Sequence, residues 1–197
     1  MFDMGGVVVK HCDSSLERSI LRDLGITDHD SFTSLDPSLR PLLDQHSKDA
    51  IDEEEMWRQF SVITGIDVPP SKDSLWGRYF NPELDDHVLE IIQELKEGGY
   101  RVVCATNTEA SHFAHHRDSG HYGIFDAVYA SPQLKEVKPD RAFFDKILAT
   151  EQVKPEETVF IDDLVENCEA AINLGINAFL YADPVELRWD LASIGLL

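Results

Sequence analysis

The clearest periodic pattern in the chain begins just after residue 80. Apolar side chains recur there at helical spacing, at Leu84, Val88, Ile91, Ile92 and Leu95. Asn81 is suited to cap such a helix and Pro82 to occupy its first turn, while Gly98-Gly99 is typical of a helix end. The pattern therefore predicts a helix that starts at Asn81-Pro82 and stops at Gly98.

Short, continuous apolar runs alternate with helical stretches in the rest of the C-terminal part. The runs are VVCA at 102–105, TVFI at 158–161 and AFLY at 178–181. A helical stretch at 141–150 precedes the second run, and a helix ending at Gly175 precedes the third. Such runs are typical of strands buried on both faces of a parallel sheet. The alternation predicts an α/β fold with a Rossmann-like, doubly wound parallel sheet, whose ligands bind at the carboxyl ends of the strands.

The region from 11 to 80 has a different pattern. Residues 14–24 and 52–64 are amphipathic at helical spacing, and no run between them resembles a buried strand. We expect a Rossmann-like core made of residues 1–10 and 81–197, with residues 11–80 inserted as a small helical cap after the first strand. Only two residues precede Asp3, whereas strands usually run about five residues. This suggests a first strand that is truncated or a native start that lies upstream.

Charge restricts the classes of partner. The chain has 17 Lys and Arg residues against 37 Asp and Glu residues, a net charge of −20. Such a surface repels nucleic acids and anionic membranes, so neither is expected as a partner. It also repels phosphorylated metabolites at long range, so a phosphate pocket would need a cation or local positive groups.

Cysteine usage and hydropathy indicate the compartment. The three cysteines are widely spaced and odd in number, which favours reduced thiols over a disulfide framework. No apolar run reaches the roughly 18–20 residues of a membrane span, and no basic-then-apolar leader opens the chain. These features predict a cytoplasmic protein, and they give no indication of its oligomeric state.

Reactive side chains stand where the predicted strands end. They are Asp3, Thr106-Asn107, Lys138 and Asp162-Asp163. Because the carboxyl ends of parallel strands share one edge of a sheet, we expect these residues to converge there.

Each residue type suits chemistry on a phosphate group. The carboxylate of Asp3 can attack phosphorus, and with Asp163 it can hold Mg²⁺, which prefers oxygen ligands. The Thr106 hydroxyl and neighbouring backbone N–H groups can bind phosphate oxygens, and Lys138 can neutralise charge in the transition state.

Plainer readings exist for several of these residues. Asp3 could belong to a turn, Thr106-Asn107 to an Asx-type strand end, and Asp162-Asp163 to a helix cap. Asn167 could orient the acidic pair or lie on a helix surface, and the sequence favours neither.

Two further features compete with the predicted site. Lys135 is close enough to Lys138 to be mistaken for it. His112 and His116, four residues apart, suggest a metal site, but without a third ligand an exposed helix face is the preferred interpretation.

The motifs FDMGGVV, VVCATNT, KEVKPDRAFF and TVFIDDLVENCEAAINLGI, in that order, resemble those of the haloacid dehalogenase-like hydrolases. The segment LLDQHSKDAIDEEEMWRQF is similar to the helical cap that these proteins insert after the first strand. The resemblance implies an aspartyl-phosphate mechanism with Asp3 as nucleophile. It also implies Mg²⁺ held by Asp3, the Gly5 backbone carbonyl and Asp163, with Asp162 assisting through water. The intact Asp162-Asp163 pair favours phosphoryl transfer over dehalogenation.

Gly5 departs from the pattern of most phosphatases in this family, which have an acid at this position. That acid protonates the leaving group and then activates water, help worth roughly 10²–10⁴-fold in rate. A replacement could come from the cap or its linkers, where His11, Asp44 and His46 are candidates.

A branch of the family with the same Asp-hydrophobic-Gly opening includes sugar-phosphate phosphatases of the α-glucose-1-phosphate type. We therefore expect a slowed Mg²⁺-dependent phosphohydrolase acting on a small phosphorylated metabolite, with a sugar phosphate as the leading substrate. The alternative is a catalytically impaired protein that binds phosphoryl ligands or a partner without turnover.

Overall fold

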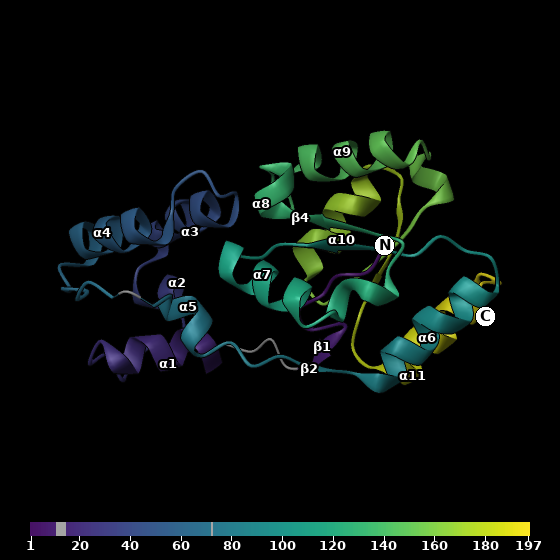
Figure 1. The fold of residues 1–197 in the computed structure, drawn as a ribbon. Coiled ribbons are helices and arrows are strands. Elements are labelled where there is room, and N and C mark those ends of the chain that lie inside the picture. Colours follow the sequence, from purple (N-terminus) through teal and green to yellow (C-terminus); the bar gives the residue numbers. More distant parts are fainter. Residues whose placement is uncertain (11–14, 72) are drawn as a thin grey trace.

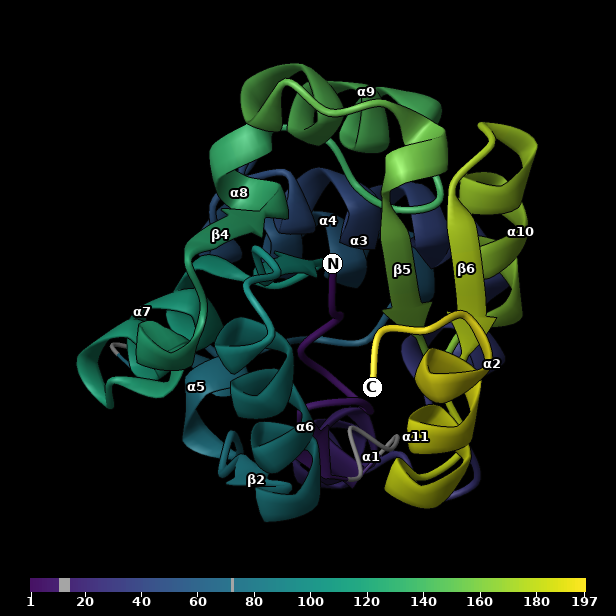
Figure 2. The ribbon, with the colours of Figure 1, turned by 90° about the vertical axis from the view of Figure 1, so that its right-hand side faces the viewer.

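The central sheet consists of two parallel strand pairs that flank the first residues of the chain (Figure 2). The computed structural model describes residues 1–10, 15–71 and 73–197. Strand β3 (Val103–Thr106) pairs with β4 (Ala127–Ala130), and β5 (Val159–Asp162) pairs with β6 (Asn177–Leu180). The predicted Rossmann-like α/β class is confirmed.

The N-terminal residues join the two pairs through backbone hydrogen bonds. The Phe2 N–H donates to the Val103 carbonyl at 2.9 Å, and the Phe2 carbonyl accepts from Ala105 N–H at 2.8 Å. On the other side, the Asp3 N–H donates to the Ile161 carbonyl at 2.9 Å. These first residues therefore occupy the position of a central strand between the two pairs, and Asp3 lies at the carboxyl end of that strand.

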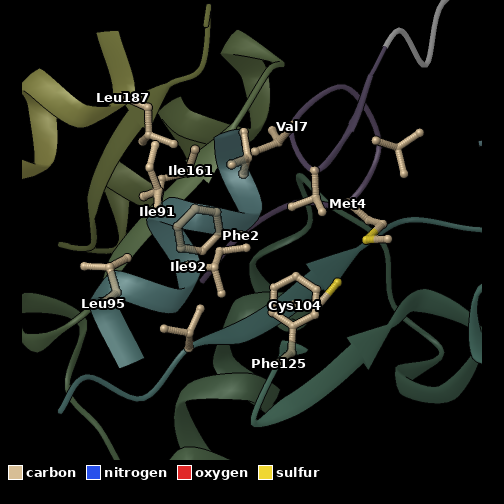
Figure 3. Packing of buried hydrophobic residues seen from close by; sticks show 14 of the residues in the cluster. Phe2, Met4, Val7, Ile91, Ile92, Leu95, Cys104, Phe125, Ile161 and Leu187 are labelled. Carbon is tan, nitrogen blue, oxygen red and sulfur yellow. The ribbon is translucent and has the colours of Figure 1, made fainter. Parts of the chain in front are cut away.

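Helices cover both faces of the sheet. Helices α6 (Asp86–Glu97) and α11 (Pro184–Ser193) pack on one face, while α9 (Arg141–Glu151) and α10 (Val165–Asn173) pack on the other. The Phe2 ring, 2% exposed, lies among apolar side chains of α6 in the first of these layers (Figure 3). Burying a side chain of this size contributes about 1.5–3 kcal/mol, which anchors the residue before Asp3.

The core also contains the helix α7 (Ala110–Asp118) and three short helical elements, η2 (His121–Ile124), α8 (Ser131–Leu134) and η3 (Pro155–Glu157).

The cap is entirely helical in the described residues. Its elements are α1 (Ser15–Asp23), α2 (Phe32–Leu35), η1 (Pro37–Leu39), α3 (Arg40–Ser47), α4 (Glu53–Thr64) and α5 (Leu75–Arg78). They lie together to one side of the core (Figure 1). The cap has its own cluster of buried residues, in which Phe32 contacts the rings of Trp57, Phe60 and Trp76 at centroid distances of 5.4–5.7 Å. This separate cluster supports our proposal that residues 11–80 form the cap and that residues 1–10 and 81–197 form the core.

Two antiparallel strands connect cap and core. Strand β1 (Val9–Lys10) enters the cap and β2 (Glu83–Leu84) leaves it, with an ion pair of 2.9 Å between the Lys10 and Glu83 side chains.

The predicted helix start at Asn81-Pro82 is therefore wrong. Glu83–Leu84 is extended because it pairs with Val9–Lys10, and the helix begins only at Asp86. Its N-cap is Asp85, whose side chain accepts from the His87 N–H at 2.9 Å.

Strand β4 was not anticipated from the sequence. Its residues, AVYA, form a short apolar run like those of the predicted strands, but they are half-buried except for the last. Among the described residues β4 pairs with β3 alone, which places it at the edge of the sheet.

Within the described part of the chain, no helix combines the length and apolar character that crossing a membrane requires.

Replacement of Phe32 by Ala tests the cap cluster. Phe32 is fully buried, so we expect the free energy of unfolding, measured by urea denaturation, to fall by about 3–5 kcal/mol. Val62→Ala is the matched control, because Val62 lies in the cap but is 74% exposed, and such changes stay within about 0.5 kcal/mol. Equal losses in the two variants would contradict this account of the cap.

Candidate active site

Asp3 lies at the carboxyl edge of the sheet, followed by a tight turn. It is only 7% exposed. The Met4 carbonyl accepts from both Val8 N–H and Val9 N–H, at 3.0 and 2.7 Å, and this reverses the chain immediately after Asp3. Gly6, with φ of +76°, provides the left-handed backbone that the turn needs.

Lys138 places one ammonium group between two carboxylates. Its Nζ lies 2.7 Å from Asp3 Oδ1 and 2.6 Å from Asp162 Oδ2, and the Lys138 side chain is 1% exposed. The contact with Asp162 is a hydrogen bond, whereas Asp3 Oδ1 forms an ion pair without hydrogen-bond alignment. The lysine is therefore fixed by charge on both sides.

Asp162 is held from its other side as well. Its Oδ1 accepts from the Leu164 N–H and from Asn167 Nδ2, both at 2.9 Å. Asn167 is 3% exposed, so its side chain contacts Asp162 and does not lie on the helix surface.

The three aspartates form a cluster suited to a cation. Asp3, Asp162 and Asp163 each offer a carboxylate oxygen, and these oxygens lie within 4.8 Å of one another. Against these three acids the cluster contains the single ammonium of Lys138.

Burial and, to a smaller extent, the neighbouring carboxylates raise the pKa values of two of the acids. Burial raises the pKa of Asp3 to about 7, and the Asp162 and Asp163 charges add to this while Lys138 acts against it. Burial and the Asp162 charge also raise the pKa of Asp163. Burial lowers the pKa of Lys138, but the charges of Asp3 and Asp162 outweigh it and the net shift is upward. A hard divalent cation with oxygen ligands would relieve the excess, so the residues present fit Mg²⁺.

The turn also passes close to the Asp163 carboxylate at Gly6. A Cβ atom at Gly6 would lie 2.2 Å from Asp163 Oδ2, so a side chain there would displace the carboxylate. Gly5 has no such backbone requirement, since Gly6 is the residue with positive φ in this turn.

Thr106 is the last residue of β3 and Asn107 follows it, at the same edge of the sheet. Thr106 is 2% exposed, and its hydroxyl donates weakly to the Asn107 carbonyl at 3.2 Å. The Asn107 side chain forms two hydrogen bonds with the backbone of Lys138: Nδ2 donates to its carbonyl at 2.9 Å, and Oδ1 accepts from its N–H at 2.8 Å. The sequence predicted that Asn107 binds substrate, but it did not predict these hydrogen bonds to Lys138, because no local pattern connects residues 31 positions apart.

Three consecutive cap residues reach the loops that carry these groups. Ser47 Oγ donates to Glu109 Oε1 at 3.0 Å, and Glu109 is three residues beyond Thr106. The next two form ion pairs on either side of Lys138 in the sequence: Lys48 with Asp140 at 3.0 Å and Asp49 with Lys135 at 2.7 Å. Lys135 is thus a cap contact and distinct from the buried Lys138.

The candidates for a replacement acid or base make other contacts. His46 is 6% exposed and its ring stacks on Trp76, while Asp44 forms an ion pair with Arg40 at 3.2 Å. His11 lies outside the described residues.

His112 and His116 do not form the exposed helix face that we expected. They are 7% and 3% exposed, because Phe80 covers this side of α7 with ring centroids at 3.7 and 5.1 Å.

The family model of the haloacid dehalogenase-like hydrolases matches residues 75–181, more than half of the chain. The chain belongs to this family. The resemblance of the sequence to this family is confirmed.

Two curated relatives cover nearly the whole chain. The sesquiterpene phosphatase astK of Aspergillus oryzae is 28% identical over 98% of this chain and 94% of its own length. The D-ribitol-5-phosphate phosphatase of Bacteroides thetaiotaomicron is 27% identical over 98% and 96%. The prediction of a hydrolase of the phosphatase type is confirmed.

A solved structure has the same fold over most of its length. A haloacid dehalogenase-family enzyme from Bacteroides thetaiotaomicron, in complex with magnesium and inorganic phosphate, superimposes with a TM-score of 0.70. The two chains are 23% identical, and the match covers 92% of each. This similarity confirms the fold, including the cap.

Gly6→Ala tests the close approach to Asp163, and Gly99→Ala is its matched control. Both glycines have positive φ, at +76° and +85°, but a Cβ at Gly99 meets nothing within 4 Å. We expect both variants to lose about 1–2 kcal/mol of unfolding free energy from the left-handed backbone. Only Gly6→Ala should also lose most of the phosphatase activity, because its methyl group displaces the Asp163 carboxylate. Full activity in Gly6→Ala would show that the position of Asp163 does not matter.

Proposed function

We propose that the chain is a Mg²⁺-dependent phosphohydrolase in which Asp3 is the nucleophile. The observation that carries the proposal is the placement of a buried Asp3 carboxylate against Lys138, within 4.8 Å of Asp162 and Asp163. A phosphate ester is the substrate class that uses a nucleophilic carboxylate, a buried cation and a divalent metal site together.

Each residue has a proposed role. Asp3, Asp163 and the Gly5 carbonyl would hold Mg²⁺, with Asp162 assisting through water. The metal would supply charge neutralisation for the phosphoryl oxygens. Lys138 neutralises charge on the transferring group, and the Thr106 hydroxyl, with backbone N–H groups at the start of α7, positions the phosphate.

The reaction proceeds in two displacements. A carboxylate oxygen of Asp3 forms a bond to phosphorus while the ester P–O bond breaks, and the leaving oxygen takes up a proton from solvent water. A water molecule then attacks the aspartyl-phosphate, which releases inorganic phosphate, restores the carboxylate and returns one proton to the solvent. Asp3 and Asp162 raise the pKa of Lys138, which keeps its ammonium group protonated beside the free Asp3 carboxylate.

Asn107 is proposed to act on the substrate indirectly, by positioning Lys138. Its two hydrogen bonds fix the backbone of Lys138, and through it the ammonium group beside Asp3. We propose Asn107 as a positioning residue in addition to its predicted place in the phosphate site.

The substrate is proposed to be a small phosphorylated metabolite, with a sugar phosphate as the first choice. The curated relatives are a sesquiterpene phosphatase and a D-ribitol-5-phosphate phosphatase, and the second of these names supports the phosphate ester of a sugar-like polyol. The net charge of −20 argues against nucleic acid or anionic membranes as partners, and a cytoplasmic location fits the free thiols of Cys104 and Cys168.

Gly5 favours a second candidate function, a protein that binds phosphoryl ligands or a partner without turnover. A glycine cannot donate or accept the proton that the usual acid at this position handles, so discharge of the aspartyl-phosphate is the step expected to be slow.

Asp3→Asn and Gly5→Asp together separate the two functions. The assay measures phosphate release with Mg²⁺ from a panel of sugar phosphates and from 4-nitrophenyl phosphate. We expect the parent to turn over, Asp3→Asn to lose at least about 10³-fold, and Gly5→Asp to gain roughly 10²-fold, within the range of general acid–base help.

Asp145→Asn is the control, because Asp145 is a half-exposed acid on α9 that pairs with Arg141 at 3.0 Å. It should match the parent. An inert parent that gains turnover on Gly5→Asp would support the binding protein. Mg²⁺-independent release of halide from a haloacid would contradict both functions.

A further inference from the structure

Unpartnered polar atoms are concentrated where the cap meets the core. Among the described residues, five fully buried side-chain nitrogen or oxygen atoms have no hydrogen-bond partner. One is Asp3 Oδ1 in the candidate active site, and three others are His46 Nδ1, Trp76 Nε1 and Ser111 Oγ. Buried polar atoms are almost always hydrogen-bonded in folded proteins. Three such atoms at one junction therefore indicate a partner that the chain itself does not supply.

The three side chains are neighbours in space. The rings of Trp76 on α5 and His46 on α3 are stacked, with centroids 5.8 Å apart. A Cβ atom at Gly77, the residue after Trp76, would lie 3.7 Å from the Cβ atom of Ser111 on α7. The Trp76 carbonyl also lies 3.1 Å from Nε2 of His112, the residue after Ser111. Two cap helices and one core helix therefore meet at Trp76.

This junction adjoins the residues proposed to hold the phosphate. Ser111 is in the first turn of α7, whose backbone N–H groups are proposed to position the phosphate. On the cap side, Ser47 follows His46 and donates to Glu109 at 3.0 Å, and Glu109 is three residues beyond Thr106. The organic part of a phosphate ester held there would lie beside the junction.

The chemistry of the three groups favours hydroxyls as their ligands. An indole N–H only donates, whereas a serine hydroxyl and a neutral imidazole can donate or accept. Burial lowers the pKa of His46, so its ring is neutral near pH 7 and, like Trp76 and Ser111, it offers no cation to a second phosphate or a carboxylate. The nearby Glu53 and Glu109 would repel such an anion. An alcohol hydroxyl both donates and accepts, so it can satisfy all three groups.

We propose that Trp76, Ser111 and His46 bind hydroxyl groups of the substrate, which is then the phosphate monoester of a polyhydroxylated alcohol. An apolar alcohol would leave the same three atoms buried without partners, and a site that hydrogen-bonds a substrate hydroxyl discriminates strongly against an analogue that lacks it. The atoms are covered by the contact of cap and core, so the substrate enters when the cap moves away. This assignment rests on the proposed function, since it concerns the substrate of the same site.

Two substrates that differ only in their hydroxyl groups test the proposal. D-ribitol 5-phosphate and n-pentyl phosphate share an unbranched five-carbon chain and one phosphate, and only the first carries further hydroxyls. The assay measures phosphate release with Mg²⁺. We expect kcat/KM of the parent to be at least about 30-fold higher for D-ribitol 5-phosphate, since three neutral hydrogen bonds contribute roughly 3–10-fold each.

Trp76→Phe removes the indole N–H and keeps an aromatic ring, and Ser111→Ala removes the hydroxyl. Each should lower the ratio of the two kcat/KM values by roughly 3–10-fold, mainly through a higher KM for D-ribitol 5-phosphate. Neither should lower kcat/KM for n-pentyl phosphate.

Trp57→Phe is the matched control. Trp57 belongs to the same cap cluster as Trp76, but its Nε1 already donates to Glu53 at 3.0 Å. This variant should keep the ratio of the parent.

Equal kcat/KM values for the two substrates in the parent would overturn the proposal. A ratio that stays constant in both Trp76→Phe and Ser111→Ala would also overturn it, because enclosed water would then be the partner of these atoms. An equal change in Trp57→Phe would overturn it as well. If Trp76→Phe fails to fold, the comparison of the parent with Ser111→Ala decides the matter.

A binding measurement separates this proposal from the proposed function. Isothermal titration calorimetry with Mg²⁺ gives the Kd of each phosphate for a parent that does not turn over. An inert parent that binds D-ribitol 5-phosphate at least about tenfold more tightly than n-pentyl phosphate, and loses most of this preference in Trp76→Phe, would overturn only the phosphatase. Turnover of 4-nitrophenyl phosphate with no preference between the other two substrates would overturn only the role of Trp76, Ser111 and His46.

Discussion

The buried ammonium group of Lys138, between Asp3 and Asp162, is the constraint on which the site depends. The lysine side chain is 1% exposed and those of its two partners are 11% and 0% exposed, so water cannot screen the charges. Removing one member of such a buried group typically costs about 3–5 kcal/mol, because the remaining charge is left unpaired. The three side chains must therefore be brought together accurately by the fold, from segments at residues 3, 138 and 162.

Several local features serve that requirement. The short N-terminal segment bonds to β3 and β5, which places Asp3 between Thr106 and Asp162. Asn107 fixes the backbone of Lys138, Asn167 fixes the carboxylate of Asp162, and Gly6 leaves room for Asp163. The arrangement still carries more negative than positive charge. This excess is the physical reason to expect a divalent cation. A bound cation would also offset the long-range repulsion between an acidic protein and a phosphate.

The sequence predicted the features that depend on local pattern and on strand ends. Apolar runs located β3, β5 and β6, and the polar residues at their ends predicted the candidate site, whose side chains the structure brings together at one edge of the sheet. Features that depend on pairing between distant segments were not predictable in the same way. Leu84 fits a helical period, yet pairing with Val9 makes it extended. The contact of Asn107 with Lys138 and that of His112 with Trp76 cross 31 and 36 residues, and no periodicity encodes such distances.

The central claim is that Asp3 itself becomes phosphorylated. The most direct test is rapid quenching of the parent during turnover of a phosphate ester with Mg²⁺, followed by reductive trapping and peptide mass spectrometry. We predict that the trapped product maps to Asp3, in the peptide that begins the chain, and accumulates because Gly5 slows its discharge. Steady turnover with no modification at Asp3, and undiminished turnover in Asp3→Asn, would contradict the account.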